Sequence, residues 1–291
     1  MYKAIAANKR NTLFIMAAFV GIIGAIGWVI GYLYNDISIT YIVVVVTAIY
    51  ALIQYFAASK LAVASTGAVE IQKRDNPRLF RIVENLSITL GIATPKIYVI
   101  EDSAPNAFAT GRDPKHAIVA TTTGLLDIMD DNELEAVMAH EMGHVQNYDI
   151  RVSMIAFGLV SAIALLSDIV MRMFIFGDRR DSNVNPVVIV VGIVIIVLAP
   201  IMALIIQMAI SRQREYLADA TGSLTTRHPE ALATALEKLA RYGKPMQKQS
   251  SATAHLFISN PLKAGGLSKL FSTHPPLEDR IKRLRQNSDK F

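Results

Sequence analysis

Four long apolar stretches limit what this chain can fold into more than any other feature of its sequence. They are Thr12 to Tyr34, Ile39 to Phe56, Val152 to Phe176 and Val187 to Ile210. A helix of about 20 residues crosses the roughly 30 Å hydrocarbon core of a bilayer, where the backbone must satisfy its own hydrogen bonds. We therefore predict four transmembrane helices in two hairpins. The third stretch carries Asp168 and Arg172, which can neutralise each other across one helical turn.

The composition agrees with a membrane protein, because 52% of the 291 residues are hydrophobic and only 18% are charged. The absence of cysteine excludes a disulfide framework and a thiolate metal site, and it fits a reducing compartment. The net charge of +5 is modest and forms no basic stripe suited to DNA, so we expect no nucleic-acid partner. The first apolar stretch is too long for a removable signal peptide.

Basic residues near the apolar stretches predict the orientation, since cytoplasmic flanks carry an excess of Lys and Arg. Those beside the first, second and fourth stretches are Lys3, Lys9, Arg10, Lys60, Lys73, Arg74, Arg212 and Arg214. The turn between the first two stretches holds Asp36 and no basic residue. We therefore expect both termini and both polar blocks in the cytoplasm. The pair Arg179-Arg180, between the last two stretches, departs from this rule.

The polar blocks contain patterns of helices and short strands. The predicted helices are Asn76 to Leu90, Asp131 to Asn147, Glu230 to Tyr242 and a short charged helix that closes the chain. Gly91 ends the first of them, and Asp131 or Asn132 is the expected N-cap of the second. β-like runs at Lys96 to Ile100 and Ala117 to Thr122 flank a predicted loop at Asp102 to Lys115, and Gly243 to Ser268 is predicted to be loose.

A metal-binding pattern lies at the end of the second predicted helix, in His140-Glu141-Met142-Gly143-His144. Residues four apart share a helix face, so both imidazoles can reach one zinc ion. Zinc lowers the pKa of a bound water to about 7, and Glu141 can take its proton as general base. The pattern also arises by chance, in which case it is only a polar helix face.

A third ligand is available in the helical run from Arg214 to Asp219, directly after the fourth apolar stretch. Glu215 can complete a His, His, Glu set, and Asp219 can accept the free N–H of a ligating histidine. The alternative is a surface carboxylate pair near basic residues. A metzincin is excluded, because Asn147 and Ile150 occupy its glycine and histidine positions. An intramembrane protease is disfavoured, because the histidine motif follows a polar block.

The chain resembles the HtpX branch of the family that also contains the CAAX prenyl proteases. The motifs that carry this resemblance are Asn106 to Gly111, His140 to His144, Arg214 to Asp219, His274-Pro275-Pro276 and Asp279-Arg280. The resemblance implies a zinc endopeptidase with one Zn²⁺ per chain, which clears unfolded or misfolded membrane proteins from the bacterial inner membrane. It also implies that the active site faces the cytoplasm.

The same resemblance implies further site residues. His274 would donate to the oxyanion of the tetrahedral intermediate, with Arg280 holding it in place, although a polar residue before a Pro-Pro turn is the simpler interpretation. Asn106 and Ala107 would lie on an edge strand that pairs with an extended substrate, unless Asn106 only forms a turn. His116, His228 and His255 match no motif and are interpreted as surface residues.

Together these observations predict a mainly α multi-pass membrane protein, with four transmembrane helices and a cytosolic gluzincin-type zinc-protease domain that contains a small β-sheet. The expected parts are a hairpin at 1–57, a catalytic part at 58–151, a second hairpin at 152–210 and a catalytic part at 211–291. Two alternatives are a CAAX-type processing protease and a non-catalytic zinc-containing membrane adaptor. The sequence predicts no oligomeric state.

Overall fold

The computed structural model describes residues 2–33, 35–159, 212–248, 253–261 and 275–290. Several features of the sequence analysis lie outside the described residues. They are the fourth apolar stretch, the third apolar stretch beyond residue 159, the pairs Asp168/Arg172 and Arg179-Arg180, and His274. Their predicted structure and roles therefore stay predictions.

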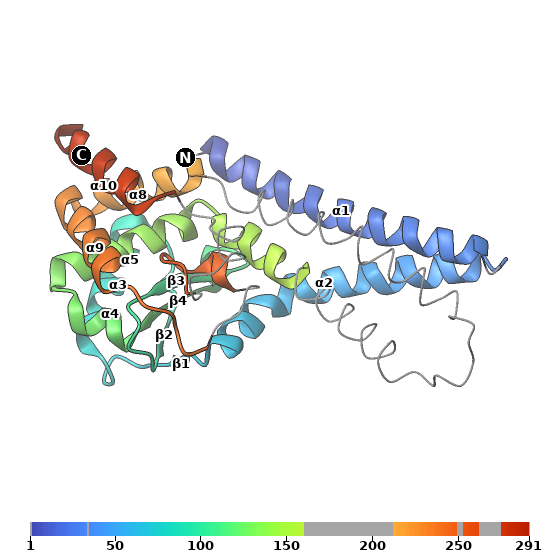
Figure 1. The fold of residues 1–291 in the computed structure, drawn as a ribbon, viewed down its shortest axis with the longest axis horizontal. Helices are drawn as coiled ribbons and strands as arrows, with labels where there is room; N and C mark the ends of the chain where they lie inside the picture. Colours follow the sequence, from blue (N-terminus) through green and yellow to red (C-terminus); the bar gives the residue numbers. More distant parts are fainter. Residues whose placement is uncertain (1, 34, 160–211, 249–252, 262–274, 291) are drawn as a thin grey trace.

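Two long helices, α1 (Tyr2–Leu33) and α2 (Ser38–Thr66), run side by side as a hairpin that projects from the rest of the protein (Figure 1). The turn between them uses Asn35 with a φ of 53°, a conformation that asparagine tolerates. Gly27 faces α2 so closely that an added Cβ would lie 2.8 Å from the Val43 side chain. The predicted pairing of two helices is confirmed, and both helices are long and apolar enough to cross a membrane.

The sheet is small and mixed. Its four strands are β1 (Val69–Glu70), β2 (Lys96–Ile100), β3 (Ala107–Gly111) and β4 (Ala117–Thr122). In the order β1-β2-β4-β3, β2 and β4 are parallel and the other two pairs are antiparallel, so β3 is an edge strand. The two predicted strands are confirmed. The predicted loop at Asp102 to Lys115 was wrong in its middle, where β3 is buried on both faces and so shows no apolar alternation.

Three helices lie between the hairpin and the end of the first polar block. They are α3 (Pro77–Leu90), α4 (Thr123–Ile128) and α5 (Asp131–Gln146). Gly91 ends α3 in a left-handed conformation, as predicted. The predicted N-cap of α5 was wrong by one residue, because Asp130 forms a capping box with Glu133. After a turn at residues 147–148, residues 149–159 are again helical.

The second polar block supplies α8 (Arg212–Thr226), α9 (Pro229–Tyr242) and α10 (Leu277–Gln286), and the last two confirm the predicted helices there. Short 3₁₀ turns are η1 (Pro114–His116), η2 (Ala254–Leu256) and η3 (Ser288–Lys290). The protein is therefore mostly helical with a small mixed sheet, as predicted.

Two apolar cores lie on opposite faces of the sheet. One core joins α3, α5 and α9 to the side chains of Ile97, Ala107 and Val119. The other joins α1, α2 and residues 152–159 to those of Ile100, Phe108 and Ile118. Because β3 and β4 are buried on both faces, elements from both polar blocks and the hairpin form one body around β3 and α5.

Candidate metal centre

The candidate site forms where α5 and α8 cross at unusually close range. A Cβ added to Gly222 of α8 would lie 3.0 Å from the backbone nitrogen of His140 and 3.3 Å from the carbonyl carbon of Ala139. A Cβ at this position would force the two backbones apart by a few tenths of an ångström. The close approach brings the first turn of α8, with Glu215, over the histidine face of α5.

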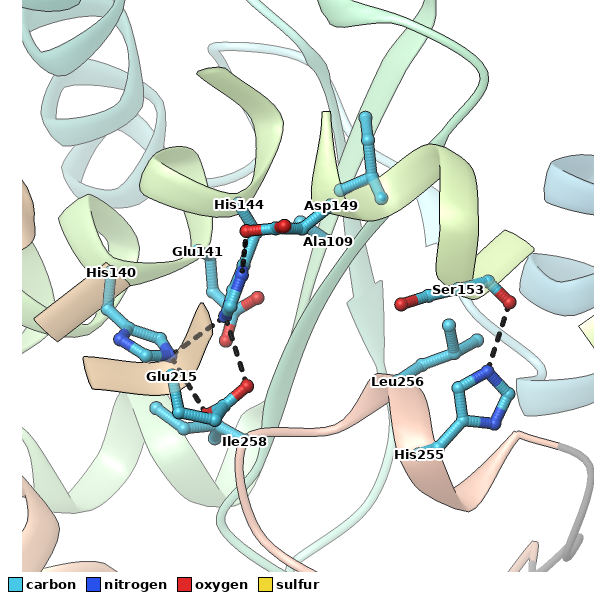
Figure 2. Close-up of a pocket in the computed structure, with 11 residues that line it drawn as sticks. Ala109, His140, Glu141, His144, Asp149, Ser153, Glu215, His255, Leu256 and Ile258 are labelled. Atoms are coloured by element: carbon cyan, nitrogen blue, oxygen red, sulfur yellow. Dashed lines mark hydrogen bonds and ion pairs between the residues drawn. The ribbon is translucent and has the colours of Figure 1, made fainter. Parts of the chain in front are cut away.

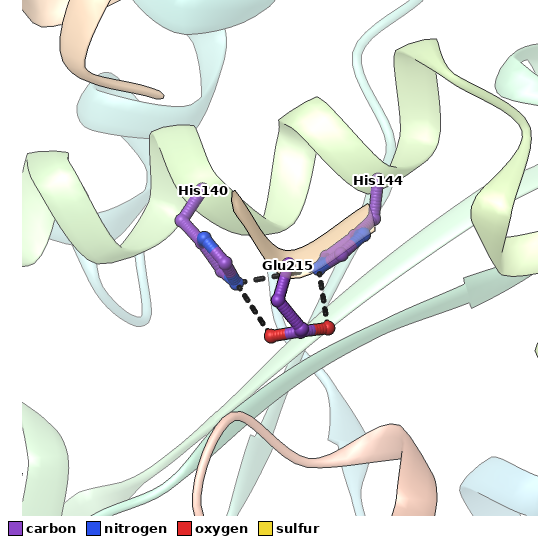
Figure 3. Close-up of side chains that lie close together, drawn as sticks. All are labelled: His140, His144 and Glu215. Atoms are coloured by element: carbon purple, nitrogen blue, oxygen red, sulfur yellow. Dashed lines mark hydrogen bonds and ion pairs between the residues drawn. The ribbon is translucent and has the colours of Figure 1, made fainter. Parts of the chain in front are cut away.

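Three side chains converge there, with the Glu215 carboxylate facing both imidazoles (Figure 3). His140 Nε2 lies 3.2 Å from His144 Nε2. The Glu215 carboxylate oxygens lie 3.8 Å from His140 Nε2 and 3.5 Å from His144 Nε2. Donor atoms in a tetrahedral zinc site, about 2.0–2.2 Å from the ion, are about 3.3–3.6 Å apart. The donor set and its spacing therefore fit a metal ion such as zinc.

The far nitrogen of His140 is held by a buried ion pair. His140 Nδ1 lies 3.0 Å from Asp219 Oδ1, and the fully buried Arg280 donates two hydrogen bonds to the same carboxylate, at 2.6 and 2.9 Å. Burial and the Arg280 charge lower the pKa of His140 to about 4. Burial would raise the pKa of Asp219, but the Arg280 charge and the hydrogen bonds from His140 and Arg280 together outweigh it and keep that pKa below its usual range. His140 is thus neutral at pH 7.

The far nitrogen of His144 meets a second carboxylate that sequence reasoning missed. His144 Nδ1 lies 3.0 Å from Asp149 Oδ2 (Figure 2). Burial alone would lower the pKa of His144, but the bond to Asp149 and the charge of Glu215 outweigh it and raise the pKa to about 9. Two signals in the sequence could have indicated this role of Asp149. A ligating histidine needs an acceptor for its second nitrogen, and Asp149 lies just beyond the end of the helix that carries the motif.

Glu141 points into the same space and is only 2% exposed. Burial raises the pKa of its carboxyl group to about 7, a shift that the neighbouring Glu215 charge increases and the His144 charge opposes. A carboxyl group with a pKa near neutral pH can both accept and return a proton.

A small cavity lies in front of these residues. Its volume is about 30 Å³, which leaves room for water but not for a peptide. The walls include Glu141, Ser153, His255, Leu256 and Ile258 (Figure 2). The prediction that His255 is a surface residue was wrong, because its ring is buried and hydrogen-bonded to the Ser153 carbonyl at 3.0 Å. His116 and His228 are exposed, as predicted.

The described residues 253–261 lie against the edge strand β3. The backbone N–H of Ile258 donates to the Ala107 carbonyl at 2.9 Å, and Phe108 and Phe257 form an antiparallel bridge. The Asn106 side chain bonds both backbone groups of Ser259, at 2.8 and 3.2 Å. Asn106 and Ala107 are thus engaged with this segment of their own chain, and their predicted role in substrate binding stays a prediction.

Comparison with known proteins gives concordant results. The sequence model of peptidase family M48 matches residues 73–288. A protein named protease HtpX homolog from Tropheryma whipplei is 54% identical over 291 residues, with 100% of both chains covered. Another of that name, from Dictyoglomus turgidum, is 41% identical over 294 residues, covering 100% of this chain and 96% of the other.

A solved structure is also similar. The crystal structure of S. mikatae Ste24p has a TM-score of 0.53 and 20% identity, covering 98% of this chain and 67% of that one. At this identity the likeness concerns the fold alone.

Proposed function

Because this chain belongs to peptidase family M48 and is a metalloprotease, we propose that His140, His144 and Glu215 hold one zinc ion and that Glu141 is the general base of peptide hydrolysis. The observation that carries this proposal is the convergence of three metal-binding side chains at near-tetrahedral spacing, with Glu141 buried beside them. The assignment of these three ligands and of zinc as the metal is based on that geometry and on the chemistry of the residues.

The surrounding residues prepare the site for this role. A carboxylate can only accept hydrogen bonds, so Asp219 and Asp149 each fix a hydrogen on Nδ1 and make Nε2 the nitrogen that binds metal, once His144 has lost its second proton. Zinc, when bound, would polarise the scissile carbonyl and promote ionisation of water. Glu141 takes a proton from the attacking water and delivers it to the amide nitrogen as the C–N bond breaks. His274 is proposed, from the resemblance, to stabilise the oxyanion.

The substrate is proposed to bind as an extended peptide along β3. An exposed sheet edge recognises peptides by adding a strand, which would use the backbone of Asn106 and Ala107. The segment at 253–261 covers this edge and borders the cavity. We therefore propose that a substrate exchanges with this segment, taking over the Ala107 carbonyl that Ile258 now occupies.

The membrane arrangement is proposed as four transmembrane helices in the cell (inner) membrane, with both termini and the site in the cytoplasm. The apolar hairpin α1–α2 and the fourth apolar stretch support it. The two blocks at 58–151 and 211–291 would form the catalytic domain, which agrees with the core that α3, α5 and α9 share. Misfolded membrane proteins in the same bilayer are the proposed substrates.

The test compares the wild-type protein in detergent with two variants of α5, Glu141→Gln and Glu135→Gln. All three are stripped of metal, resupplied with zinc and assayed for cleavage of casein. We expect zinc to restore cleavage in the wild type and in Glu135→Gln, while Glu141→Gln binds zinc stoichiometrically and stays inactive. Zinc-restored cleavage by Glu141→Gln would contradict the assignment of the base.

A further inference from the structure

A buried asparagine of α1 reaches the back of the candidate metal centre. Asn8 is 3% exposed, although it lies on a helix whose outer surface is largely apolar and exposed. Its side-chain amide donates one hydrogen bond to Asp149 Oδ1 at 2.7 Å and another to the Asn147 carbonyl at 2.8 Å. Both N–H groups of the amide therefore donate hydrogen bonds, and their acceptors lie about 140 positions away in the sequence.

Asp149 links this asparagine to the metal centre. Its other oxygen, Oδ2, lies 3.0 Å from His144 Nδ1, so one carboxylate joins Asn8 to a proposed zinc ligand. Arg214 Nε, at 3.7 Å from Oδ1, adds a positive charge to the same carboxylate. The direction in which Asp149 presents Oδ2 sets the rotation of the His144 ring and thus the position of its Nε2.

The turn that carries Asp149 has an unusual backbone conformation. The helix α5 ends at Gln146, and Tyr148 has a φ of 63°, a conformation rare for a bulky residue. Asn8 bonds the residues on both sides of Tyr148, and the neighbouring Lys9 ammonium lies 4.6 Å from the Tyr148 ring centroid. The first turns of α1 thus hold the strained turn that carries Asp149.

We propose that Asn8 is a positioning residue of the metal centre, which holds the Asp149 carboxylate in the orientation that accepts His144 Nδ1–H. This inference rests on the proposed ligand role of His144. An amide is required because it donates to two acceptors. An aspartate at position 8 would face a second carboxylate at 2.7 Å, and an alanine would leave two buried acceptors unpaired. An apolar helix of the membrane hairpin thereby becomes part of the catalytic apparatus, outside the residues that the family model matches.

The test uses the full-length protein in detergent and three variants, Asn8→Ala, Asn8→Asp and the control Asn11→Ala on the same helix. Three quantities are measured for each protein. They are the zinc Kd by chelator competition, the visible absorption spectrum after Co²⁺ substitution, and the Tm with and without metal. We expect both Asn8 variants to bind zinc about 10–100-fold more weakly, with an altered Co²⁺ spectrum, while Asn11→Ala matches the wild type. An unchanged Kd and Co²⁺ spectrum, with only the metal-free Tm lowered, would overturn the proposal and leave Asn8 as a structural anchor.

A double-mutant cycle with Asp149→Asn tests the route through Asp149. If Asn8 acts through that carboxylate, Asn8→Ala has little further effect on the zinc Kd in the Asp149→Asn background. Additive effects on the Kd would exclude this route. Failure of the wild type to bind zinc would instead refute the proposed function, so the two failures are distinguishable.

Discussion

The close crossing of α5 and α8 yields a sharp prediction for Gly222→Ala. The new Cβ would lie 3.0 Å from the His140 nitrogen, 3.2 Å from the His140 Cα and 3.3 Å from the Ala139 carbonyl carbon. These neighbours are backbone atoms in the middle of a helix and cannot rotate away. The two helices must therefore move apart.

The size of this displacement follows from ordinary contact distances. Carbon atoms pack best at about 3.5–4.0 Å, so the helices have to separate by about 0.5 Å. Metal sites tolerate deviations of only about 0.2 Å in ligand distance. Glu215, on α8, would move away from His140 and His144 by more than that. We expect zinc binding about 10–100-fold weaker and an unfolding free energy lower by about 1–2 kcal/mol, since overpacking outweighs the gain in helix propensity.

The matched control is Gly143→Ala, the same substitution at the same helix crossing. Its Cβ would lie 3.4 Å from the Thr221 Cβ and 3.5 Å from the Ala218 Cα, which are ordinary contacts. We expect its zinc Kd to stay within about threefold of wild type, because an ordinary van der Waals contact does not force the helices apart. The assay is chelator competition for the Kd and calorimetry for stability. A wild-type Kd in Gly222→Ala, or an equal loss in both variants, would refute the reasoning from backbone distance.

Three further predictions follow from the site. Arg280→Met leaves the buried Asp219 carboxylate without the Arg280 cation and should cost about 3–5 kcal/mol of unfolding free energy by denaturant titration. Asp219→Asn in the same protein should relieve this loss of stability. The raised pKa of His144, about 9, means that zinc must displace a proton, so its affinity should climb nearly tenfold per pH unit between pH 6 and 8 and level off above about 9. An affinity independent of pH would contradict this pKa. Ile258→Pro removes the N–H that bonds the Ala107 carbonyl and should raise the rate of casein cleavage, whereas an unchanged rate would argue against exchange at β3.

Spacing along the chain predicted the parts of the site that local geometry determines. His140 and His144 share a helix face, Glu215 and Asp219 share another, and the apolar hairpin followed from length and hydropathy. These features depend on helical periodicity alone. Contacts between different elements were predicted for Glu215 and Asp219, but not for the other residues around the site.

The features that were missed all depend on tertiary contacts. The residue pattern itself did not show β3, which only the resemblance indicated at Asn106 and Ala107, because burial on both faces removes the alternation that marks a half-exposed strand. Asp149 acquires its role from a turn at Tyr148 with unusual backbone geometry, and His255 is buried only because its segment lies over the sheet edge. The link to Asn8 joins residues about 140 positions apart, beyond the reach of any local pattern.

The segment that covers β3 also bears on how such a protein avoids capturing chains indiscriminately. An uncovered sheet edge pairs with any extended polypeptide, a hazard for neighbours and for other copies of the protease. Because residues 253–261 are tethered to the body they cover, they compete at an effective concentration on the order of millimolar. A dilute free peptide loses that competition. If misfolded membrane proteins are the substrates, as proposed, a chain confined to the same bilayer with a long unpaired stretch near β3 has a higher local concentration than a free peptide. Its selection would then follow from local concentration rather than from side-chain recognition.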